Sequence, residues 1–497
     1  MMTPAPRDLV SRVNKIGGKS TLFPPIFRSR RSSLRTSATP PHARRQGAWA
    51  TIRIADTLIL CGFILSAATV AASSAHWPQW RGPLFNGVAP DAAPPAEWSE
   101  NQVAWKTPLP GLGHSTPLII GDYLYLTTAV PVDEPADSDT FAQQFADIQE
   151  WQRDRIRTTE NVHNYVVMAI NRINGTVAWQ TVVHTQAPVH RTHSGGSWAS
   201  ASPVTDGKHI YAWFGSYGLY CLNVHGQVLW SKDFGILRMK NHFGEGASPA
   251  IYGDRLIIAS DTEDDSFIAV LDTADGSEIW RHERDEQTSW ATPLVLKSAD
   301  GEPEVIISAT RRIKSYRLAD GTVNWQTTGM TANVVPHPVS DGELLFVMSG
   351  FRGNALLAIE QNQARGDFSE SHEFVRWQRN RNTPYVPSPV LHEGLLYFLE
   401  RNNGRITCVR AANGEPLYEN IVIDGLAGVY ASPLLANGRL YIPDLEGNIA
   451  VLAAGEEYRL LGINKLPDAF TASPVAIGND LYLRGHGNLW CIRADGE

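Results

Sequence analysis

One short pattern recurs along the chain and limits the folds open to it. An apolar run, a turn containing glycine and a second run ending in tryptophan follow one another at residues 269–280, AVLDTADGSEIW. Asp-Gly and Asn-Gly pairs between short apolar runs are strong signals for a two-residue hairpin, because that turn needs positive φ. The pattern therefore predicts repeated β-hairpins. It returns at residues 168–179, 221–230, 314–325 and 408–418.

A second pattern precedes these copies: a small residue, a proline, an apolar run, a glycine turn and another apolar run. Residues 247–258, ASPAIYGDRLII, show it clearly. A period of roughly 40–50 residues with four short strands per unit predicts a propeller blade, and eight starts predict eight blades. A pair of β-sandwiches would share the short strands but would not explain a fixed period. The eight prolines are Pro117, Pro203, Pro249, Pro293, Pro338, Pro389, Pro433 and Pro474.

The aromatic residue that ends each hairpin gives an independent count of the blades. A large buried aromatic at the same place in every repeat is typical of scaffold packing. Eight such positions agree with eight blades. They are Trp105, Trp179, Trp230, Trp280, Trp325, Trp377, Tyr418 and Tyr458.

The two ends of the repeat array complete each other. Residues 102–109 match the second half of a repeat that has no first half, whereas residues 489–497 stop just after the Asp495-Gly496 turn. We therefore predict an all-β, eight-bladed β-propeller with four antiparallel strands per blade. The N-terminal strand at residues 101–107 should pair with the strand ending near Ile492 and close the ring.

These paired patterns resemble the PQQ-like β-propeller repeat family, and the resemblance covers nearly everything after residue 76. It implies that the tryptophan of each repeat docks between neighbouring blades. The family includes quinoprotein dehydrogenases, a barrel-assembly lipoprotein and many secreted proteins of no known activity. Its dehydrogenases hold the quinone on a tryptophan floor with calcium, and many have two adjacent cysteines, which this chain lacks.

The first 75 residues differ from the rest in charge. They carry 11 Lys+Arg and 2 Asp+Glu, which leaves 32 basic and 49 acidic residues in the body and argues against nucleic-acid binding. A short apolar run at residues 58–72 precedes small residues, which predicts a cleaved signal peptide in residues 1–75; an uncleaved anchor is the alternative. We expect export to the periplasm, cell envelope or medium, with no stable transmembrane span after cleavage.

We predict that residues 76–100 form an irregular N-terminal arm and that residues 101–497 form the propeller. The arm begins with WPQWRGP and should pack across one end of the propeller. An insertion at about residues 131–164 contains a helical pattern over residues 140–157, with Asp139 as a plausible N-cap. This helix should lie against the outside of its blade; docking of a partner is the alternative role.

Residues just before each Ser/Thr-Pro pair should ring one mouth of the central channel. Aromatic faces with a few polar groups are the usual lining of a ligand pocket, although aromatics can also simply plug a channel. The candidate ligand-binding residues are Trp198, His242, Glu245, Trp290, Asn333, His337, Tyr385, Tyr430 and Phe470.

Charged loops near this mouth have two interpretations each. The basic residues His184, His190, Arg191 and His193, with Arg379 and Arg381, could hold an anion or could be solvated loop charge. The acidic loop at residues 261–265 could offer carboxylates to calcium, but it lacks calcium-motif spacing and a solvated loop is the simpler interpretation. We find no catalytic or metal-binding motif and predict no catalytic or metal-ligating residues.

The sequence therefore favours a non-catalytic binding or scaffold protein of the cell envelope, with no cofactor expected. Its partner would be an unidentified envelope protein or a small ligand, and the chain should be a monomer that binds no nucleic acid. The alternative is a PQQ-dependent quinoprotein oxidoreductase with PQQ and calcium. A third reading is a carbohydrate-active enzyme that uses the central channel.

Overall fold

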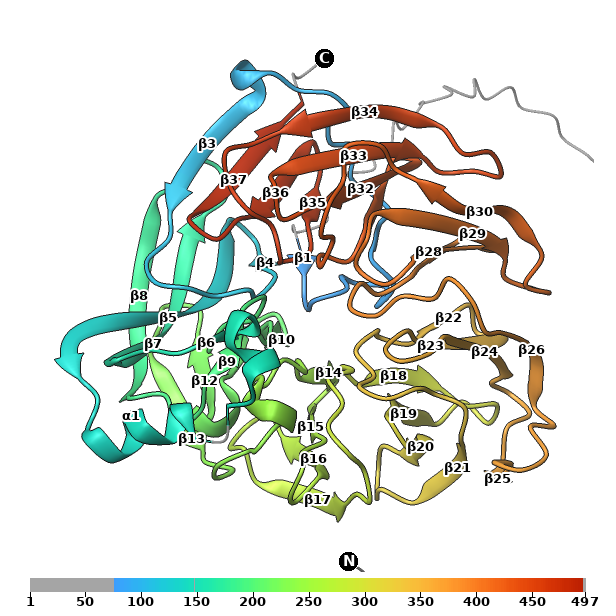
Figure 1. Cartoon of the computed structure of the whole chain (residues 1–497), viewed down its shortest axis with the longest axis horizontal. Coiled ribbons are helices and arrows are strands. Elements are labelled where there is room, and N and C mark those ends of the chain that lie inside the picture. Colours follow the sequence, from blue (N-terminus) through green and yellow to red (C-terminus); the bar gives the residue numbers. More distant parts are fainter. Residues whose placement is uncertain (1–75, 147, 495–497) are drawn as a thin grey trace, which may run out of the picture. The chain divides into compact units, whose positions relative to one another are not determined.

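The computed structural model describes residues 76–146 and 148–494. The basic leader and the predicted signal segment lie outside the described residues. Eight antiparallel sheets of at least four strands follow one another around a common centre (Figure 1). The structure thus confirms the predicted eight-bladed β-propeller.

The first four blades follow the order of the chain, each running from the channel outwards. Blade 1 holds β4 (Leu118–Ile120), β5 (Tyr123–Pro135), β7 (Asn161–Asn171) and β8 (Val177–Gln186). Blade 2 holds β10 (Val204–Thr205), β11 (His209–Trp213), β12 (Leu219–Asn223) and β13 (Val228–Lys232). Blade 3 holds β14 (Ala250–Tyr252), β15 (Arg255–Ser260), β16 (Phe267–Asp272) and β17 (Glu278–Glu283). Blade 4 holds β18 (Leu294–Lys297), β19 (Pro303–Ser308), β20 (Ile313–Arg317) and β21 (Val323–Thr327), with β25 (Gly366–Asp367) on its outer edge.

The last four blades complete the ring. Blade 5 holds β22 (Val339–Ser340), β23 (Leu344–Ser349), β24 (Ala355–Glu360) and β26 (Val375–Arg379). Blade 6 holds β27 (Val390–His392), β28 (Leu395–Leu399), β29 (Arg405–Arg410) and β30 (Pro416–Val422). Blade 7 holds β31 (Leu434–Ala436), β32 (Arg439–Pro443), β33 (Asn448–Ala453) and β34 (Leu460–Lys465). Blade 8 holds β35 (Val475–Ile477), β36 (Asp480–Arg484) and β37 (Asn488–Arg493), with β3 (Val103–Pro108) as its outer strand.

Ring closure by the N-terminal strand is confirmed in register. β3 pairs antiparallel with β37, so that Trp105 lies opposite Cys491 and Val103 opposite Ile492. The last blade is therefore built from both ends of the described chain, and β3 covers the edge of β37 that would otherwise be unpaired.

The repeated tryptophan docks on the glycine turn of the next blade. Gly276 has φ of +73°, and a Cβ there would lie 2.8 Å from the ring of Trp230. Only glycine combines this backbone conformation with so close a ring. The Trp230 indole N–H also donates to the backbone carbonyl of Thr273 at 3.1 Å, which fixes the ring in the groove. The same ring-on-glycine contact joins Trp105 to Gly175, Trp179 to Gly226, Trp280 to Gly321 and Trp377 to Gly414.

Three blades depart from this pattern. In blade 6 the outer-strand aromatic is Tyr418, whose ring packs on that of Tyr458 with centroids 5.9 Å apart. β25 pairs parallel with β21 opposite Trp325, so the ring of Trp325 packs against Phe368 instead of a glycine turn. In blade 7 the position opposite Val451 is Gly462, and Tyr458 lies before the strand begins. The prediction that Tyr458 occupies the outer-strand aromatic position is therefore wrong, although the count of eight blades stands.

A belt of hydrogen bonds joins the blades around the channel at the Ser/Thr-Pro pairs. The residue before each proline donates its backbone N–H to the hydroxyl of the next blade, for example Thr116 to Ser202 Oγ at 2.9 Å. The last blade closes the belt, because Ser473 donates to Thr116 Oγ1 at 3.2 Å. His337 interrupts the belt in blade 5, where its ring Nδ1 instead contacts the Thr292 carbonyl at 3.0 Å. The other links are Ser202 to Ser248, Ser248 to Thr292, His337 to Ser388, Ser388 to Ser432 and Ser432 to Ser473.

The N-terminal arm crosses the channel and contributes two short strands. β1 (His76–Trp77) pairs with β4 of blade 1 at the centre of the ring (Figure 1), and β2 (Val88–Ala89) pairs parallel with β31 of blade 7. Between them, Arg81 is 3% exposed and donates to the carbonyls of Pro433 and Pro389 at 3.2 and 2.8 Å. The arm is thus tied to blades 1, 6 and 7 and closes one end of the channel.

The insertion in blade 1 differs from the expectation of one helix on the outside of the blade. It forms α1 (Ser138–Phe145), capped by Asp137 rather than Asp139, and a separate 3₁₀ helix, η2 (Glu150–Arg155). The Arg191 guanidinium donates to the carbonyls of Gln144 and Ala146 at 3.0 and 2.8 Å and holds the end of α1. A two-stranded ribbon of β6 (Ile156–Arg157) and β9 (Thr192–His193) then fixes the insertion beside the channel mouth.

Candidate functional site

Two connected cavities occupy the end of the channel that the arm leaves open. The inner cavity, called the chamber below, has a volume of about 230 Å³, and the outer one, called the vestibule, about 650 Å³. His193, Phe243, Tyr385 and Tyr430 line both, so the two spaces are continuous. A void of only about 10 Å³ lies against Trp80, Arg81 and His337, so the arm leaves almost no space at the closed end.

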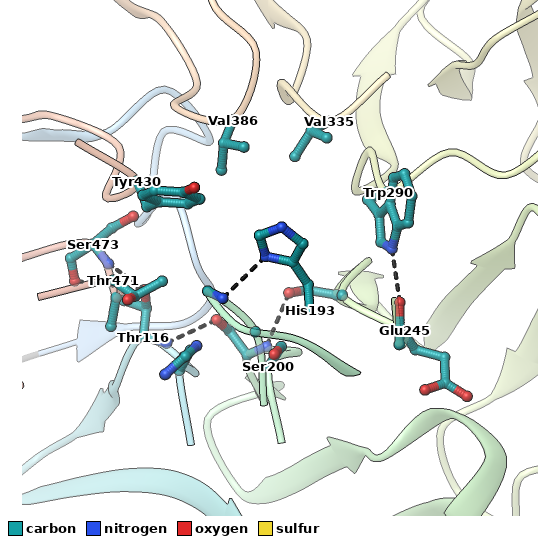
Figure 2. A pocket seen from close by; sticks show the side chains of 18 of the residues that line it. Thr116, His193, Ser200, Glu245, Trp290, Val335, Val386, Tyr430, Thr471 and Ser473 are labelled. Carbon is teal, nitrogen blue, oxygen red and sulfur yellow. Dashed lines mark hydrogen bonds between the residues drawn. The ribbon is translucent and has the colours of Figure 1, made fainter. Parts of the chain in front are cut away.

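Aromatic and hydroxyl side chains form the chamber. Trp80 of the arm lines its floor, and its indole N–H donates to Ser473 Oγ of the belt at 3.1 Å. Trp290 and Tyr430 stand on opposite sides (Figure 2). The Trp290 indole N–H donates to the Gly244 carbonyl at 2.8 Å, which fixes this ring against the wall. The belt hydroxyls at the deep end are those of Thr116, Ser202, Ser248 and Ser473.

His193 projects into the chamber between Tyr430 and Trp290 (Figure 2). Its Nδ1 accepts a hydrogen bond from the Gly195 N–H at 3.0 Å, so the neutral ring carries its proton on Nε2. Burial lowers the pKa of His193, and the nearby Arg155 and Arg157 lower it further. At neutral pH this side chain is therefore an uncharged donor aimed at the cavity.

Glu245 is the one carboxylate among the described residues that line the two cavities. Its Oε1 accepts hydrogen bonds from the backbone N–H of Ser216, at 3.1 Å, and from the Ser216 hydroxyl. Figure 2 shows the carboxylate directed away from His193. Burial raises the pKa of Glu245. The carboxylate thus anchors the loop before blade 3 to blade 2 instead of facing a ligand.

A stacked histidine pair lies at the blade 8 side of the chamber. The rings of His114 and His486 are 4.8 Å apart at 18°, and the Thr471 hydroxyl contacts His486 Nε2 at 2.8 Å. Burial lowers the pKa of both histidines. Asp468 is close, but its carboxylate accepts from the indole of Trp490 and from Asn488 at 3.1 and 3.0 Å rather than from a histidine.

Three cations face the vestibule. Arg155 comes from η2, Lys240 from the 3₁₀ helix η4 (Lys240–His242) and Arg352 from the loop between β23 and β24. No ion pair joins any of the three to a carboxylate in the described part of the chain. Aromatic rings complete the wall: Trp151, Phe243, Phe351, Tyr385 and Tyr430.

Five of the nine sequence-predicted site residues line the chamber or the vestibule. Glu245 and Trp290 line the chamber, Asn333 lines the vestibule, and Tyr385 and Tyr430 line both. His337 lies at the closed end, with its ring 5.9 Å from that of Trp80. The remaining three line neither cavity. Trp198 donates to the His190 carbonyl at 2.8 Å, the ring of His242 packs on that of His190, and Phe470 is wholly buried.

The sequence reasoning missed several lining residues. Trp80 belongs to the Trp-rich arm, and Trp151 and Arg155 belong to the insertion, so none precedes a Ser/Thr-Pro pair. Arg352 lies in the loop between β23 and β24, the two middle strands of blade 5. The Phe-Arg-Gly sequence at 351–353 was the only local signal, since glycine after a charged residue marks an exposed turn.

The charged loops singled out in the sequence are mostly engaged elsewhere. Arg379 and Arg381 both pair with Glu419, so they are not available at the mouth. Asp261 is 4% exposed and binds Arg284, with 2.7 Å between Oδ1 and Nε. Asp264 pairs with Arg238, and Glu263 accepts from the Thr288 hydroxyl. These two loops are therefore structural in this fold.

Calcium, which the alternative function requires beside PQQ, does not match the side chains that line the two cavities. Calcium takes six to eight oxygen ligands, usually with several carboxylates. The two cavities offer the single carboxylate of Glu245, already bonded to Ser216. Within residues 76–146 and 148–494, no group of three or more His, Cys, Asp or Glu is placed to hold a metal ion. The same ranges contain no helix long and apolar enough to cross a membrane.

Comparison with known proteins places the chain in a family. A curated relative, the outer membrane protein assembly factor BamB of Yersinia pestis, is 23% identical over 205 residues, which cover 37% of this chain and 49% of the relative. The match thus spans about half the length of that relative. Two solved structures share the fold. A europium-containing methanol dehydrogenase has a TM-score of 0.56 and 11% identity, and the match covers 84% of this chain and 91% of that one. The quinohemoprotein alcohol dehydrogenase of Comamonas testosteroni has a TM-score of 0.54 and 10% identity, and the match covers 85% of this chain and 81% of that one. The family model described as outer membrane protein assembly factor BamB matches residues 163–420, more than half of the chain, and the chain therefore belongs to this family of PQQ-like propellers.

Proposed function

We propose that this chain is an exported binding and scaffold protein of the cell envelope that acts without catalysis. The observation that carries the proposal is the channel itself, which is closed at one end and open at the other. Trp80 and Arg81 seal the inner end by hydrogen bonds to the belt and to backbone carbonyls. A rigid cavity with one opening suits retention of a ligand or of a partner's side chains.

The polar groups of the chamber support binding rather than reaction. A general base must lie within hydrogen-bonding reach of the proton it removes and be held by a third group. Glu245 is engaged with Ser216, and His193 accepts from a backbone N–H. Family membership supports the envelope location, as does the apolar segment at residues 58–72.

Crosslinking in the native cell tests the scaffold function. The tagged full chain is crosslinked, the envelope and cytoplasmic fractions are separated, and the captured proteins are identified by mass spectrometry. We expect the chain in the envelope fraction with a reproducible protein partner. Recovery from the cytoplasm, or from the envelope without any enriched partner, would contradict the proposal.

The oxidoreductase alternative has a direct test. Purified protein is mixed with PQQ and calcium, binding is followed by tryptophan fluorescence, and dye reduction is measured with a panel of alcohols and sugars. We expect neither saturable quinone binding nor substrate-dependent reduction. Micromolar binding with substrate-dependent reduction would replace our proposal with the quinoprotein function.

One observation favours the carbohydrate-active enzyme as a second candidate. The Thr471 hydroxyl and His486 Nε2, 2.8 Å apart beside the chamber, form a hydroxyl–base contact of the kind that activates nucleophiles. No described carboxylate binds the other nitrogen of His486, so the orienting third group is missing. Hydrolysis of a chromogenic glycoside panel that is abolished by Thr471→Val would favour this candidate.

A further inference from the structure

The vestibule has a charge opposite to that of the protein around it. The body of the chain has 49 acidic and 32 basic residues, yet Arg155, Lys240 and Arg352 face this cavity and no Asp or Glu lines it. We propose that the vestibule and chamber bind an acidic saccharide, a chain of sugar rings that bear carboxylate or sulfate groups. This inference deepens the proposed binding function and rests on it.

The three cations are available to a ligand. Fourteen of the 32 Lys and Arg side chains in the described chain form ion pairs with carboxylates, and Arg155, Lys240 and Arg352 are among those that form none. The nearest ring partners are Trp151 for Arg155, at 5.9 Å, and Phe351 for Arg352, at 5.4 Å. Such contacts leave the guanidinium N–H groups free to bind an anionic oxygen bidentately.

The backbone that presents Arg352 is strained. Its φ is +53°, a left-handed conformation that costs a residue with a Cβ about 1–2 kcal/mol. Residues held this way cluster at ligand sites, where surrounding contacts compensate for the strain. Here Phe351 stacks on Tyr385 with ring centroids 5.0 Å apart, so the loop is fixed beside the cavity. Asn241 and Asn333, which also line the vestibule, have φ of 55° and 57°.

The aromatic and hydroxyl groups define the rest of the ligand. Trp151 is 52% exposed, and Trp290, held by its bond to the Gly244 carbonyl, and Tyr430 present rings to the chamber. Flat aromatic faces are electron-rich and attract the C–H faces of a sugar ring. The belt hydroxyls of Ser202 and Ser248 each accept one backbone N–H and keep their own proton for donation. A polyhydroxylated ring uses both features, whereas a flat aromatic acid would leave the hydroxyl groups unpaired.

His193 links the two cavities in this arrangement. It lines both, and its ring is perpendicular to that of Phe243 at 4.9 Å. With Nδ1 occupied by the Gly195 N–H, its Nε2–H donates to a ligand hydroxyl or carboxylate that spans chamber and vestibule. The vestibule volume of about 650 Å³ is within the usual range for ligand sites.

Isothermal titration of the purified protein with defined oligosaccharides tests the proposal. The probes are trigalacturonate, its fully methyl-esterified form and a κ-carrageenan tetrasaccharide that carries sulfate. We expect saturable binding of at least one acidic probe, at least tenfold weaker binding of the uncharged ester, and affinity that falls as salt rises. Which of the two acidic probes binds distinguishes recognition of carboxylate groups from recognition of sulfate groups. Equal affinity for trigalacturonate and its ester, or no saturable binding by either acidic probe, would overturn the proposal.

A matched pair of variants localises the site. Arg352→Gln should weaken the acidic probe about tenfold, whereas Arg401→Gln should change affinity less than twofold. Arg401 is a matched control for Arg352. Like Arg352 it is exposed, has a positive φ, at 48°, and forms no ion pair in the described chain, but it lines neither cavity. Equal effects of the two variants would place any binding outside the vestibule and overturn the assignment.

The outcome is separable from that of the crosslinking experiment. Titration uses purified protein and needs no partner, and crosslinking needs no sugar. Failure of titration with a partner still captured would remove the saccharide and leave the scaffold function. Binding of PQQ that is weakened by Arg352→Gln, together with no binding of either acidic saccharide, would also overturn this inference.

Discussion

The two ends of the central channel use the same kinds of side chain for opposite purposes. At the closed end, Arg81 is 3% exposed and its guanidinium donates to the carbonyls of Pro389, Pro433 and Asn86. At the open end, Arg352 is exposed, its guanidinium lies 5.4 Å from the ring of Phe351, and it forms no ion pair in the described chain. Trp80 donates to Ser473 at one end, while Trp151 is half exposed at the other.

The difference shows that hydrogen-bond satisfaction, not residue type, separates structure from function here. A buried guanidinium whose two Nη atoms donate to backbone carbonyls stabilises the fold and offers those donors to no ligand. Burial lowers the pKa of Arg81 to about 9, which reflects its removal from water. An exposed cation beside a cavity and without a carboxylate partner contributes little to stability and is available for binding.

Acid should produce the largest effect, because a neutral histidine is buried near each end. Burial lowers the pKa of His337, at the closed end, and of His190, near the open end, to about 4. Between pH 6.5 and 4 these histidines are protonated in the unfolded chain but stay neutral in the folded one. The free energy of unfolding is therefore at its full value above about pH 6.5, and each histidine lowers it by about 3 kcal/mol by pH 4. Urea unfolding across this range measures the loss.

Two variants assign the acid effect to one end or the other. His337→Gln and His190→Gln should each reduce the pH-dependent loss in the free energy of unfolding by the part that its own histidine contributes, about 3 kcal/mol. A free energy of unfolding that stays constant between pH 7 and 4.5 in the unaltered protein would show that the buried histidines are protonated in the folded state as easily as in the unfolded one.

Substitution of Arg81 should be the next largest effect. Arg81→Met leaves the carbonyls of Pro389 and Pro433 without donors in a closed space, which should lower the free energy of unfolding by about 3 kcal/mol. Urea denaturation measures it, with Arg365→Met, at an exposed arginine without an ion pair, as control. A loss no larger than that of the control would mean that the arm is only loosely attached.

Gly87 tests the closed end more finely. Its φ is +78°, and a Cβ there would lie 2.2 Å from Nη2 of Arg81. Gly87→Ala should therefore displace the guanidinium and cost about 2 kcal/mol, while Gly253→Ala, at φ of +58° with open space around it, should cost only about 1 kcal/mol for the backbone. Thermal unfolding of the two variants gives the difference, and equal melting points would argue against the close contact.

The smallest effect is expected at the open end. Arg352→Gly relieves a left-handed backbone but makes the unfolded chain more flexible, so the free energy of unfolding should change by less than about 0.5 kcal/mol. Urea denaturation measures it beside Arg81→Met. A loss comparable to that of Arg81→Met would erase the distinction between the two ends.

The parts of the fold that repeat were predictable from the sequence, and the parts that do not repeat were not. Each blade must pack an outer strand on its neighbour, so Trp230 and Gly276 recur in equivalent places and predict the blades and their closure. The prediction for Tyr458 was wrong because blade 7 has Gly462, not an aromatic residue, at the equivalent position of its outer strand.

The site was only partly predictable for the same physical reason. Tyr385, Tyr430 and Trp290 follow from the repeat, because they precede a Ser/Thr-Pro pair. Trp80 and Arg155 reach the cavities from an arm and an insertion that have no counterpart in other blades, and nothing local in the sequence predicts where such segments return. Arg352 needed the backbone, because its importance rests on the charge and strain of its surroundings.

The pairing of β3 with β37 also sets an order of events during synthesis. Trp105 leaves the ribosome among the first residues of the propeller, and its partner Cys491 among the last. Trp80 likewise waits for Ser473 before the channel floor exists. A chain made from its N-terminus can stack seven blades early, but the ring and its cavity come into being together, in one late step, when the final strand arrives. A chain truncated before β37 would therefore lack the closed cavity as well as a complete last blade.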